Sequence, residues 1–296
     1  MNEPLEVNEP LEVNDFSRIG PQRHGDDAMT AEREETKYLV PSASVDAIIA
    51  AVSRHLTPHR FTGEGANRLP DAHHFVTTIY FDTPSRRHFH TAVRSVSSNV
   101  KIRAKEYYDL HPSLAELATD PSQIVKYQPW VWFEIKRRNG SHTSKRRFRL
   151  PKNQMPEVLT AGRLSAEALL DGERETAIAG LSELGEYVQS LAEPLAANTL
   201  VNYRRLSWQD EGSTLRITLD LGLSFHAPPG DLWNRNQALV RTALGRGKSP
   251  FGAAVLEVKR RSALPGWLEQ KLGELGLRAE SFSKFVAGAS VVHGTR

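Results

Sequence analysis

In Val100-Lys101-Ile102-Arg103-Ala104-Lys105, apolar or small residues and cations alternate without a break, and this alternation is the strongest indication of the fold. Successive side chains of a β-strand point to opposite faces, so the three cations share one face and the other three residues share the opposite one. The pattern predicts a strand over residues 99–107 with one basic and one apolar face. A sheet built from such strands needs a hydrophobic cover on one side and gathers positive charge on the other.

The same alternation recurs elsewhere in the chain, with Glu134 and Lys136 set against Phe133 and Ile135. Further charged residues with this spacing are Glu35, Lys37, Lys145, Arg147, Arg149, Arg216, Asp220, Glu257 and Lys259. One such strand is usually part of a half-exposed sheet whose polar face lies in water. The set as a whole, with its long cations and repeated Glu-x-Lys pairs, instead favours a barrel turned inside out.

A charged lumen explains both the cations and the carboxylates. Cations that line a lumen repel one another, and buried charges are costly when they are unpaired. A ligand with several phosphates, together with a divalent cation on the carboxylates, would balance these charges. The predicted fold class is therefore α+β, an antiparallel β-barrel tunnel with a charged lumen, flanked by helices.

Turn residues and hydrophobic periodicity give the expected elements. Strands are expected at 35–40, 75–82, 99–107, 130–138, 144–150, 198–209, 214–225 and 253–261. Helices are expected at 45–56, 85–92, 163–192 with a break near Gly172, 232–244, 266–275 and 283–292. Residues 1–30 contain a tandem Asn-Glu-Pro-Leu-Glu-Val repeat and are expected to form a disordered leader. Residues 31–296 are expected to form a single domain.

Composition narrows the class of protein. The 296 residues include no cysteine, which excludes disulfides, thiolate nucleophiles and cysteine-bound zinc. The formal net charge of +3 is modest, so a general nucleic-acid coat is not expected. No apolar stretch approaches the length of a membrane span, and the amino terminus does not resemble a secretory signal. A cytoplasmic location without a membrane segment is expected.

Eight short motifs, in order along the chain, carry a family resemblance. They are Glu35-Thr-Lys37-Tyr38, Thr78-Ile-Tyr80-Phe81-Asp82, Lys101-Ile-Arg103, Phe133-Glu-Ile-Lys136, Tyr203-Arg-Arg205, Arg216-Ile-Thr-Leu-Asp220, Leu256-Glu-Val-Lys259 and Ser283-Lys284-Phe285. Each motif alone is weak. Together, over roughly residues 33–290, they resemble the VTC domain of the triphosphate tunnel superfamily, which also contains the CYTH phosphatases.

The resemblance implies a tunnel that binds ATP and polyphosphate with Mn²⁺ or Mg²⁺ and, in the best-known members, polymerises polyphosphate from ATP. The residues implied to grip phosphates in catalysis are Lys37, Lys101, Arg103, Lys136, Arg205, Arg216 and Lys284. Further phosphate contacts are implied for Lys145, Arg147, Tyr203, Lys259 and Ser283. Glu257 is implied to hold the metal, with Glu134 as a second candidate.

Three functions remain open from the sequence. The first is a polyphosphate-forming phosphotransferase, in which a phosphate oxygen is the nucleophile and no separate base is needed. The second is a triphosphate hydrolase, which would have to activate water. Against it, Arg33 stands where CYTH proteins carry the first glutamate of Glu-x-Glu-x-Lys. Ser281 stands where polyphosphate polymerases often carry another lysine, so the first function would lack one contact with the chain. The third is a polyphosphate or nucleotide sensor without turnover.

Other motifs are assigned ordinary roles. Gly247-Lys248-Ser249 lacks the earlier glycine of a Walker A loop, since position 242 is Thr242 and Pro250 follows, so a basic loop is expected. His88 and His90 have a spacing that could bind metal, as does the His73-His74 pair. No third ligand is evident, so packing or surface positions are expected for them.

Overall fold

The computed structural model describes residues 34–59, 73–94, 98–108, 129–139, 142–234, 239, 244, 247–250 and 252–294. The strands are β1 (Glu34–Pro41), β2 (Thr57–Pro58), β3 (His73–Asp82), β4 (Ser98–Tyr108), β5 (Trp130–Asn139), β6 (His142–Pro151), β7 (Ala196–Gln209), β8 (Leu215–His226) and β9 (Ala253–Arg260). The helices are α1 (Val45–His55), α2 (Arg87–Arg94), α4 (Met155–Ala161), α5 (Arg174–Gln189), α6 (Gly266–Glu274) and α7 (Lys284–His293). Short 3-10 turns lie at Ser42–Ser44, Lys152–Gln154, Ala166–Ala168 and Asp171–Glu173.

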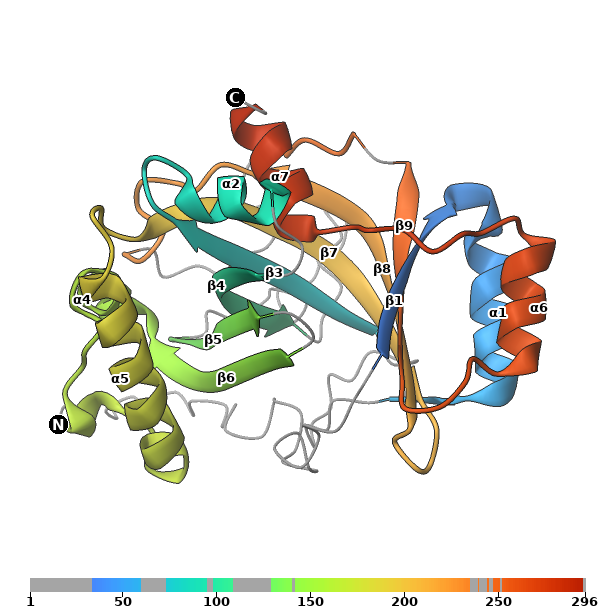
Figure 1. Cartoon of the computed structure of the whole chain (residues 1–296), viewed down its shortest axis with the longest axis horizontal. Helices are drawn as coiled ribbons and strands as arrows, with labels where there is room; N and C mark the ends of the chain where they lie inside the picture. Colours follow the sequence, from blue (N-terminus) through green and yellow to red (C-terminus); the bar gives the residue numbers. More distant parts are fainter. Residues whose placement is uncertain are drawn as a thin grey trace, which may run out of the picture.

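All nine strands belong to one antiparallel sheet. Its order is β1-β9-β8-β7-β3-β4-β5-β6, and β2 pairs with β7 beside this path. The sheet curls strongly (Figure 1), since Glu35 on one edge strand comes within 4.0 Å of Lys136 on β5, far along the order. The curl places the charged residues on its concave side. We call this side, with the alternate residues of each strand that point to it, the inner face.

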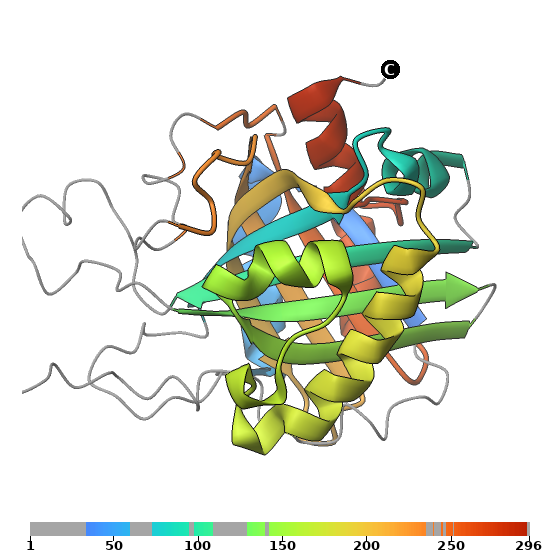
Figure 2. The same ribbon diagram turned by 90° about the vertical axis from the view of Figure 1, so that its left-hand side faces the viewer.

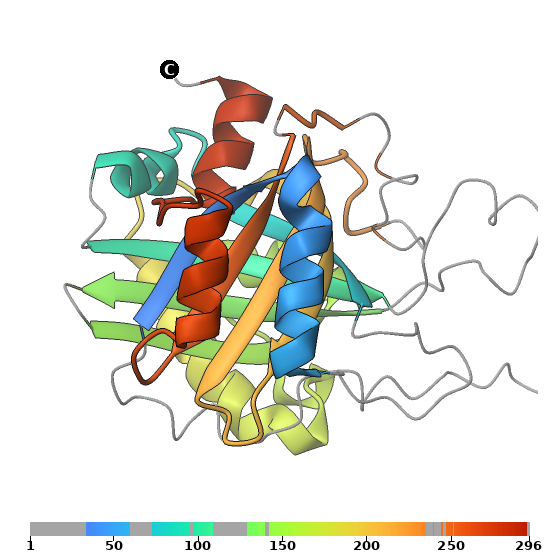
Figure 3. The ribbon, with the colours of Figure 1, turned by 90° about the vertical axis from the view of Figure 1, so that its right-hand side faces the viewer.

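Helices α1 and α6 cover the outer face of β1, β9, β8 and the adjoining end of β7 (Figure 3). They bury the apolar partners of the alternating charges, among them Leu256 and Val258 of β9 and Ile217 and Leu219 of β8. Val45, Ile48, Ile49 and Val52 form the apolar stripe of α1, as their helical spacing predicts. The sequence alternation is thus satisfied by an outer apolar layer under helices.

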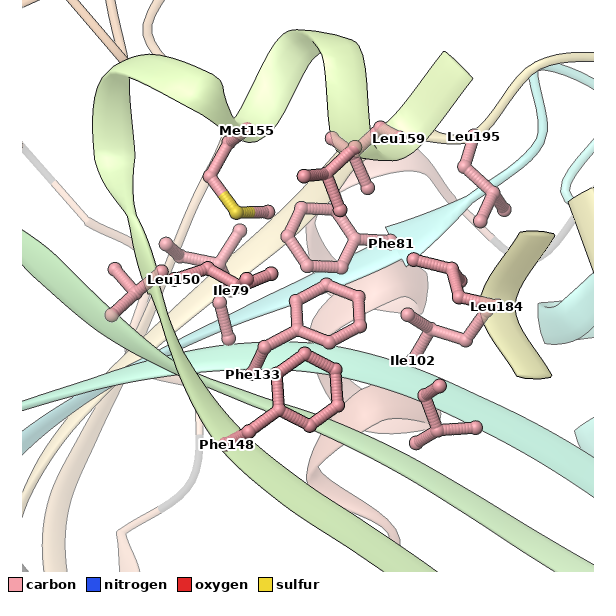
Figure 4. Packing of buried hydrophobic residues seen from close by; sticks show 14 of the residues in the cluster. Ile79, Phe81, Ile102, Phe133, Phe148, Leu150, Met155, Leu159, Leu184 and Leu195 are labelled. Atoms are coloured by element: carbon pink, nitrogen blue, oxygen red, sulfur yellow. The ribbon is translucent and has the colours of Figure 1, made fainter. Parts of the chain in front are cut away.

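A second outer core lies beneath α4 and α5, which cross β5 and β6 (Figure 2). Phe81 of β3, Phe133 of β5 and Phe148 of β6 pack ring against ring at its centre, as Figure 4 shows. Helix α5 approaches closely because Gly180 lies over the ring of Phe148, where a Cβ atom would meet Cε1 at 2.0 Å. Gly162, with φ +63°, ends α4 and lies directly against Gly185 of α5.

Helices α2 and α7 pack on the inner face instead. Phe89 and Phe285 join Tyr80, Tyr107 and Tyr203, whose strands place them on the inner face, in a third apolar cluster. Strand β8 contributes to this cluster through a break in its alternation. The register with β7 shifts between Asn202 and Arg204, opposite Gly222 with φ +58°. After this bulge the odd residues Leu223 and Phe225 face inward, whereas before it Asp220 does.

The expected strands all occur, with small shifts of their ends. The expected helical region 163–192 is a helix only over α5, preceded by two 3-10 turns. Helix α4 and strand β2 were not expected from the sequence. The expected helix at 232–244 lies mostly outside the described residues, and none of its described residues (232–234, 239 and 244) is helical. The leader, residues 1–30, lies outside them entirely.

The expected fold class is confirmed in part, because the sheet is open where a closed barrel was expected. The sheet is α+β and flanked by helices, but its edge strands β1 and β6 are not hydrogen-bonded to each other within the described chain, so it is an open curled sheet and not a closed barrel. The alternation specifies which residues face inward, whereas closure depends on the stagger of all strands together.

No helix within the described residues is long and apolar enough to cross a membrane.

Candidate functional site

The inner face brings together charged side chains from seven strands and one helix. They are Glu35 and Lys37 of β1, Glu257 and Lys259 of β9, Asp220 of β8, Arg205 of β7, Lys101, Arg103 and Lys105 of β4, Glu134 and Lys136 of β5, Arg147 of β6 and Lys284 of α7. Cations outnumber carboxylates in this set. The carboxylates divide it into three groups.

The first group surrounds Glu134, which is almost completely buried. Its carboxylate accepts a hydrogen bond from Arg103 Nε at 2.6 Å, while Lys105 Nζ lies at 3.4 Å and Arg147 Nε at 3.5 Å. Burial alone would raise the pKa of Glu134, but Arg103, Lys105 and Arg147 hold it well below its usual range. Burial and the neighbouring Arg103 lower the pKa of Lys105 well below its ordinary value. Glu134 is therefore fixed by protein cations on several sides.

The second group surrounds Asp220, which is completely buried. Arg205 donates from Nε to Oδ1 at 2.6 Å and from a terminal nitrogen to Oδ2 at 2.8 Å, and Lys284 Nζ lies 2.5 Å from Oδ2. Burial opposes ionisation of Asp220, but Arg205 and Lys284 lower its pKa below the ordinary value. The ring of Tyr203 lies about as close to both cations, 5.4 Å from the Arg205 guanidinium and 5.2 Å from Lys284 Nζ. Asp220 thus ties helix α7 to strand β7.

The third group contains two carboxylates, Glu35 and Glu257. Lys37 Nζ lies 3.1 Å from Glu35, Lys259 Nζ lies 3.9 Å from it, and Lys259 also contacts Glu257. Burial and the charge of Glu257 oppose ionisation of Glu35, yet the lysines lower its pKa. Burial likewise opposes ionisation of Glu257, whose pKa the lysines hold well below its usual range. This is the one described place on the inner face where two carboxylates act on each other.

The amino-terminal end of α7 closes the arrangement. Lys101 donates to Ser283 Oγ at 3.3 Å, and Lys37 donates to the carbonyl of Phe282 at 3.2 Å. Ser283 caps the helix by accepting from the backbone of Val286. Burial and the adjacent cations Lys37, Arg103 and Lys136 lower the pKa of Lys101 to about 8. A lysine in this position gains from an anionic ligand that would offset its neighbours.

Two residues implied as phosphate ligands, Arg216 and Lys145, lie outside these groups, and a third, Arg147, belongs to the Glu134 group but also packs on an aromatic ring. Arg216, in register with Lys259, donates to Gln209 Oε1 at 2.8 Å and lies 3.3 Å from His59 Nε2, at one rim of the inner face. Lys145 is exposed on the edge strand β6. Arg147 packs its guanidinium over Trp132, 4.2 Å from the ring centre, while it contacts Glu134.

The other implied residues, Lys37, Lys101, Arg103, Lys136, Arg205, Lys259, Lys284, Tyr203 and Ser283, are brought together on the inner face. Three charged residues of the site were not among the implied ligands: Glu35, Lys105 and Asp220. All three lie on the charged face of their strands by the alternation of every second residue. That signal marks the face on which a residue lies, but not its neighbours across the curl.

The carboxylates of the inner face differ in how well they could bind a divalent metal ion. The described residues contain no group of three or more His, Asp or Glu side chains arranged to hold a metal. Mg²⁺ and similar ions are often bound by only one or two carboxylates together with phosphates of the substrate. The pair Glu35 and Glu257 fits this pattern, because the two carboxylates repel each other. Glu134 fits less well, because its oxygens already face three cations.

The motifs assigned ordinary roles lie outside the inner-face groups. His88 is a buried residue of α2, with Nδ1 3.2 Å from Asp82 and Nε2 2.6 Å from the hydroxyl of Tyr187. Lys248 forms an isolated β-bridge with Phe225, and its Nζ donates to the carbonyl of Val291 at 3.0 Å. His73 and His74 belong to β3, but their side chains lie outside the described part of the chain.

Comparison with known proteins gives one family match, in which the model of the VTC domain matches residues 32–293. Among solved structures, the chain is similar to the Hippeastrum protein HpAC1, a proposed adenylyl cyclase with a dominant triphosphatase activity. The two share 14% identity and a TM-score of 0.46 over 88% of this chain and 97% of that one. The chain is also similar to a proposed adenylate cyclase of Bacillus halodurans, with 13% identity and a TM-score of 0.41 over 86% of this chain and 97% of that one. No curated protein matches the chain.

Proposed function

Because the chain belongs to the VTC domain family, we propose that it is an ATP-dependent phosphotransferase that forms polyphosphate. ATP and the polyphosphate chain are held on the inner face, and Mn²⁺ or Mg²⁺ binds at its carboxylates. The observation that carries this proposal is the excess of cations over carboxylates on a concave, partly buried face. Such an excess is costly in the free protein and is relieved by a ligand with several negative charges.

The residues on the inner face suit phosphoryl transfer by positioning. Lys37 and Lys101 contact the amino-terminal end of α7, and the charge of Lys136 acts on Lys101, so several phosphate oxygens can be neutralised together there. Transfer needs the nucleophile, phosphorus and leaving oxygen in line, and neutralisation of the oxygens that carry charge in the transition state. A terminal phosphate of the acceptor chain is already an anionic nucleophile, so the protein need not remove a proton from it.

The metal is proposed to bind at Glu257 with Glu35 as its partner. When bound, it would neutralise phosphate charge as a Lewis acid. Both carboxylates are held ionised, because neighbouring lysines lower the pKa of each. A carboxylate with a lowered pKa is a good metal ligand and a poor proton acceptor. This favours a transfer between phosphates over attack by water, which would need a base.

The experiment that tests the function is an incubation with ATP and Mn²⁺. Products are separated on a gel for polyphosphate and assayed for free phosphate. A ladder of polyphosphate chains is expected, and it should be lost in Lys136→Ala, since Lys136 lies on the inner face. Arg146→Ala is the matched control, because Arg146 is exposed on the outer side of the adjacent strand and pairs with Glu183.

The other products would assign other functions. Free phosphate without chains would identify a triphosphate hydrolase and overturn the proposed transfer. Neither product, with polyphosphate bound at equilibrium, would identify a sensor that binds its ligand without turnover. A ladder of equal intensity from Lys136→Ala would show that the chemistry does not take place on the inner face.

A further inference from the structure

Lys101 differs from the lysines near it in its ionic partners. Lys37 Nζ lies 3.1 Å from one carboxylate oxygen of Glu35, and Lys136 Nζ lies 4.0 Å from the other. Among the described residues, no carboxylate lies within 4.0 Å of Lys101 Nζ, which donates instead to the hydroxyl of Ser283 at 3.3 Å. A hydroxyl carries no charge, so the ammonium of Lys101 has no ion pair of its own in this part of the chain.

Cations of three strands act on this amine. They are Lys37 of β1, Arg103 of β4 and Lys136 of β5, whereas the carboxylate of Glu35 has a smaller, opposite effect. Burial and these cations lower the pKa of Lys101 to about 8. At roughly pH 7.5, about a quarter of the amine is then neutral, against about one part in a thousand for an ordinary lysine. A neutral lysine beside other cations is an activated nucleophile.

Lys101 can also be reached from outside. It is half-buried and lies in register with Lys136 of β5, whose side chain is 35% exposed. Burial lowers the pKa of Lys105, two residues along β4, as well. The side chain of Lys105 is only 8% exposed, however, and its Nζ lies 3.4 Å from Glu134. Lys101 therefore combines a reactive amine with access to it.

The surroundings of Lys101 favour an acylating reagent that carries a phosphate. Neighbouring cations form strong, charge-assisted hydrogen bonds with phosphate oxygens. A reagent bound in this way has its reactive carbon held beside the amine, which raises the effective concentration of the two groups. Acyl phosphates, the mixed anhydrides of a carboxylic acid and phosphoric acid, contain both a phosphate and an activated carbonyl group.

We propose that Lys101 is a modification site at which acyl phosphates acylate the protein without another enzyme. Nζ attacks the carbonyl carbon and forms a C–N bond, while the bond from that carbon to the phosphate oxygen breaks. The proton lost by the amine leaves with the phosphate as hydrogen phosphate. The product is a neutral amide, so the inner face loses one cation. The inference rests on phosphate binding at the inner face, as the proposed function does, but not on phosphoryl transfer.

The test is incubation of the full chain with acetyl phosphate at roughly pH 8, where about half of the Lys101 amine is neutral. Mass spectrometry of peptides taken over time locates the acetyl groups. Lys101 should react at least about tenfold faster than Lys271, which pairs with Glu274 on the outer helix α6. Lys37 and Lys136 should also react more slowly than Lys101, because each has a carboxylate nearby.

Two kinds of control locate the cause. Acetic anhydride carries no phosphate, so with this reagent the preference for Lys101 over Lys271 should be smaller. Lys136→Ala should slow acetylation of Lys101 by acetyl phosphate by about threefold, because it removes a cation that lowers the pKa of Lys101 and attracts the reagent. Arg146→Ala, which removes a cation from the outer side of β6, should leave the rate unchanged.

The outcomes separate this inference from the proposed function. Equal rates at Lys101 and Lys271, or a faster reaction at Lys37 or Lys136, would overturn the modification site. A saturating concentration of long-chain polyphosphate should slow acetylation of Lys101 by more than about tenfold, because both ligands need the same cations. Selective acetylation of Lys101 that polyphosphate does not slow would support the modification site and overturn the proposed function.

Discussion

At the scale of single residues, the inner face contains charges in three different states. Glu134 and Asp220 are each bound by protein cations at hydrogen-bonding distance. Glu35 and Glu257 act on each other, and Lys101 lies among like charges beside a serine. The first two carboxylates therefore hold the site in shape, whereas the other groups have interactions to gain from a metal or a phosphate.

The pKa of Lys101 gives a pH dependence to phosphate binding. Its free-state pKa of about 8 lies below the ordinary lysine value, and a bound phosphate would favour the charged form. Affinity for a triphosphate should therefore fall as pH rises, by about tenfold between roughly pH 7.5 and roughly pH 9.5. The ligand contributes little to this change, because its terminal phosphate has a pKa of about 6. Titration calorimetry across this range measures the slope.

Lys101→Arg is the matched variant for this prediction. Arginine keeps its charge throughout the range, so the variant should bind with an affinity that changes little with pH. A variant with the same slope as the natural protein would assign the titration to another group.

Glu257→Gln and Glu134→Gln should separate a metal ligand from a structural carboxylate. Glu257→Gln is expected to weaken Mn²⁺ binding in the presence of a non-hydrolysable triphosphate by more than about tenfold. Glu134→Gln should leave metal binding nearly intact and lower the free energy of unfolding by about 3 kcal/mol, because Arg103, Lys105 and Arg147 lose a buried partner. Calorimetry and thermal unfolding measure the two effects. The assignment fails if the two variants exchange these effects.

At the scale of elements, helix α7 connects the apolar and charged parts of the inner face. Phe285 and Ala289 join the cluster under α2, while Ser283 and Lys284 at the start of the helix lie among the charged groups. Arg86 donates to the carbonyl of Gly294 at 2.9 Å and so holds the other end. The position of two proposed phosphate ligands therefore depends on how α7 packs.

Gly288 sets that packing, which gives a prediction for the element. A Cβ atom there would meet Thr199 Cγ2 at 2.8 Å and Phe225 Cδ1 at 2.9 Å. Gly288→Ala should destabilise the fold by about 1–3 kcal/mol and weaken polyphosphate binding, because the helix must move. Thermal unfolding and equilibrium binding measure the two consequences together.

Gly273→Ala in α6 is the control, since a Cβ there would meet no atom within 4 Å. It should leave binding unchanged and stability equal or slightly higher. If Gly288→Ala behaved in the same way, α7 would have room that the observed packing does not allow.

At the scale of the whole molecule, the sheet separates its two faces almost completely. The formal net charge is only +3, yet the inner face gathers a clear excess of cations while the outer face is apolar under α1, α4, α5 and α6. Within the described residues this outer layer is not wholly apolar, since it contains Asn202, which donates to Thr77, and the buried pair of Glu106 and Lys152. Glu106 also accepts from the backbone of Leu239 at 3.0 Å, which fixes that residue on the outer side of the sheet.

This buried pair should control global stability. Burial raises the pKa of Glu106, and Lys152 acts against that rise. Lys152→Met leaves the carboxyl buried without its cation and should lower the free energy of unfolding by about 3–5 kcal/mol. Glu106→Gln combined with Lys152→Met should recover much of that loss, since a neutral amide still accepts from Leu239. Chemical unfolding of the two variants measures the difference, and equal losses would refute the pairing.

The strands, their two faces and most of the charged residues of the inner face could be predicted from the sequence alone, because the alternation of charge along Val100–Lys105 and its counterparts is a local property of the chain. It placed Lys37, Lys136 and Lys259 on the inner face, and the order of eight motifs indicated the family. Which carboxylate meets which cation could be seen only in the folded chain. Those contacts join residues far apart in the chain and depend on the curl of the sheet. The folded chain also shows that the bulge at Gly222 turns Leu223 to the inner face. It shows as well that the edge strands β1 and β6 are not paired with each other in the described chain. Closure and pairing are properties of all strands together, which no single stretch of sequence contains.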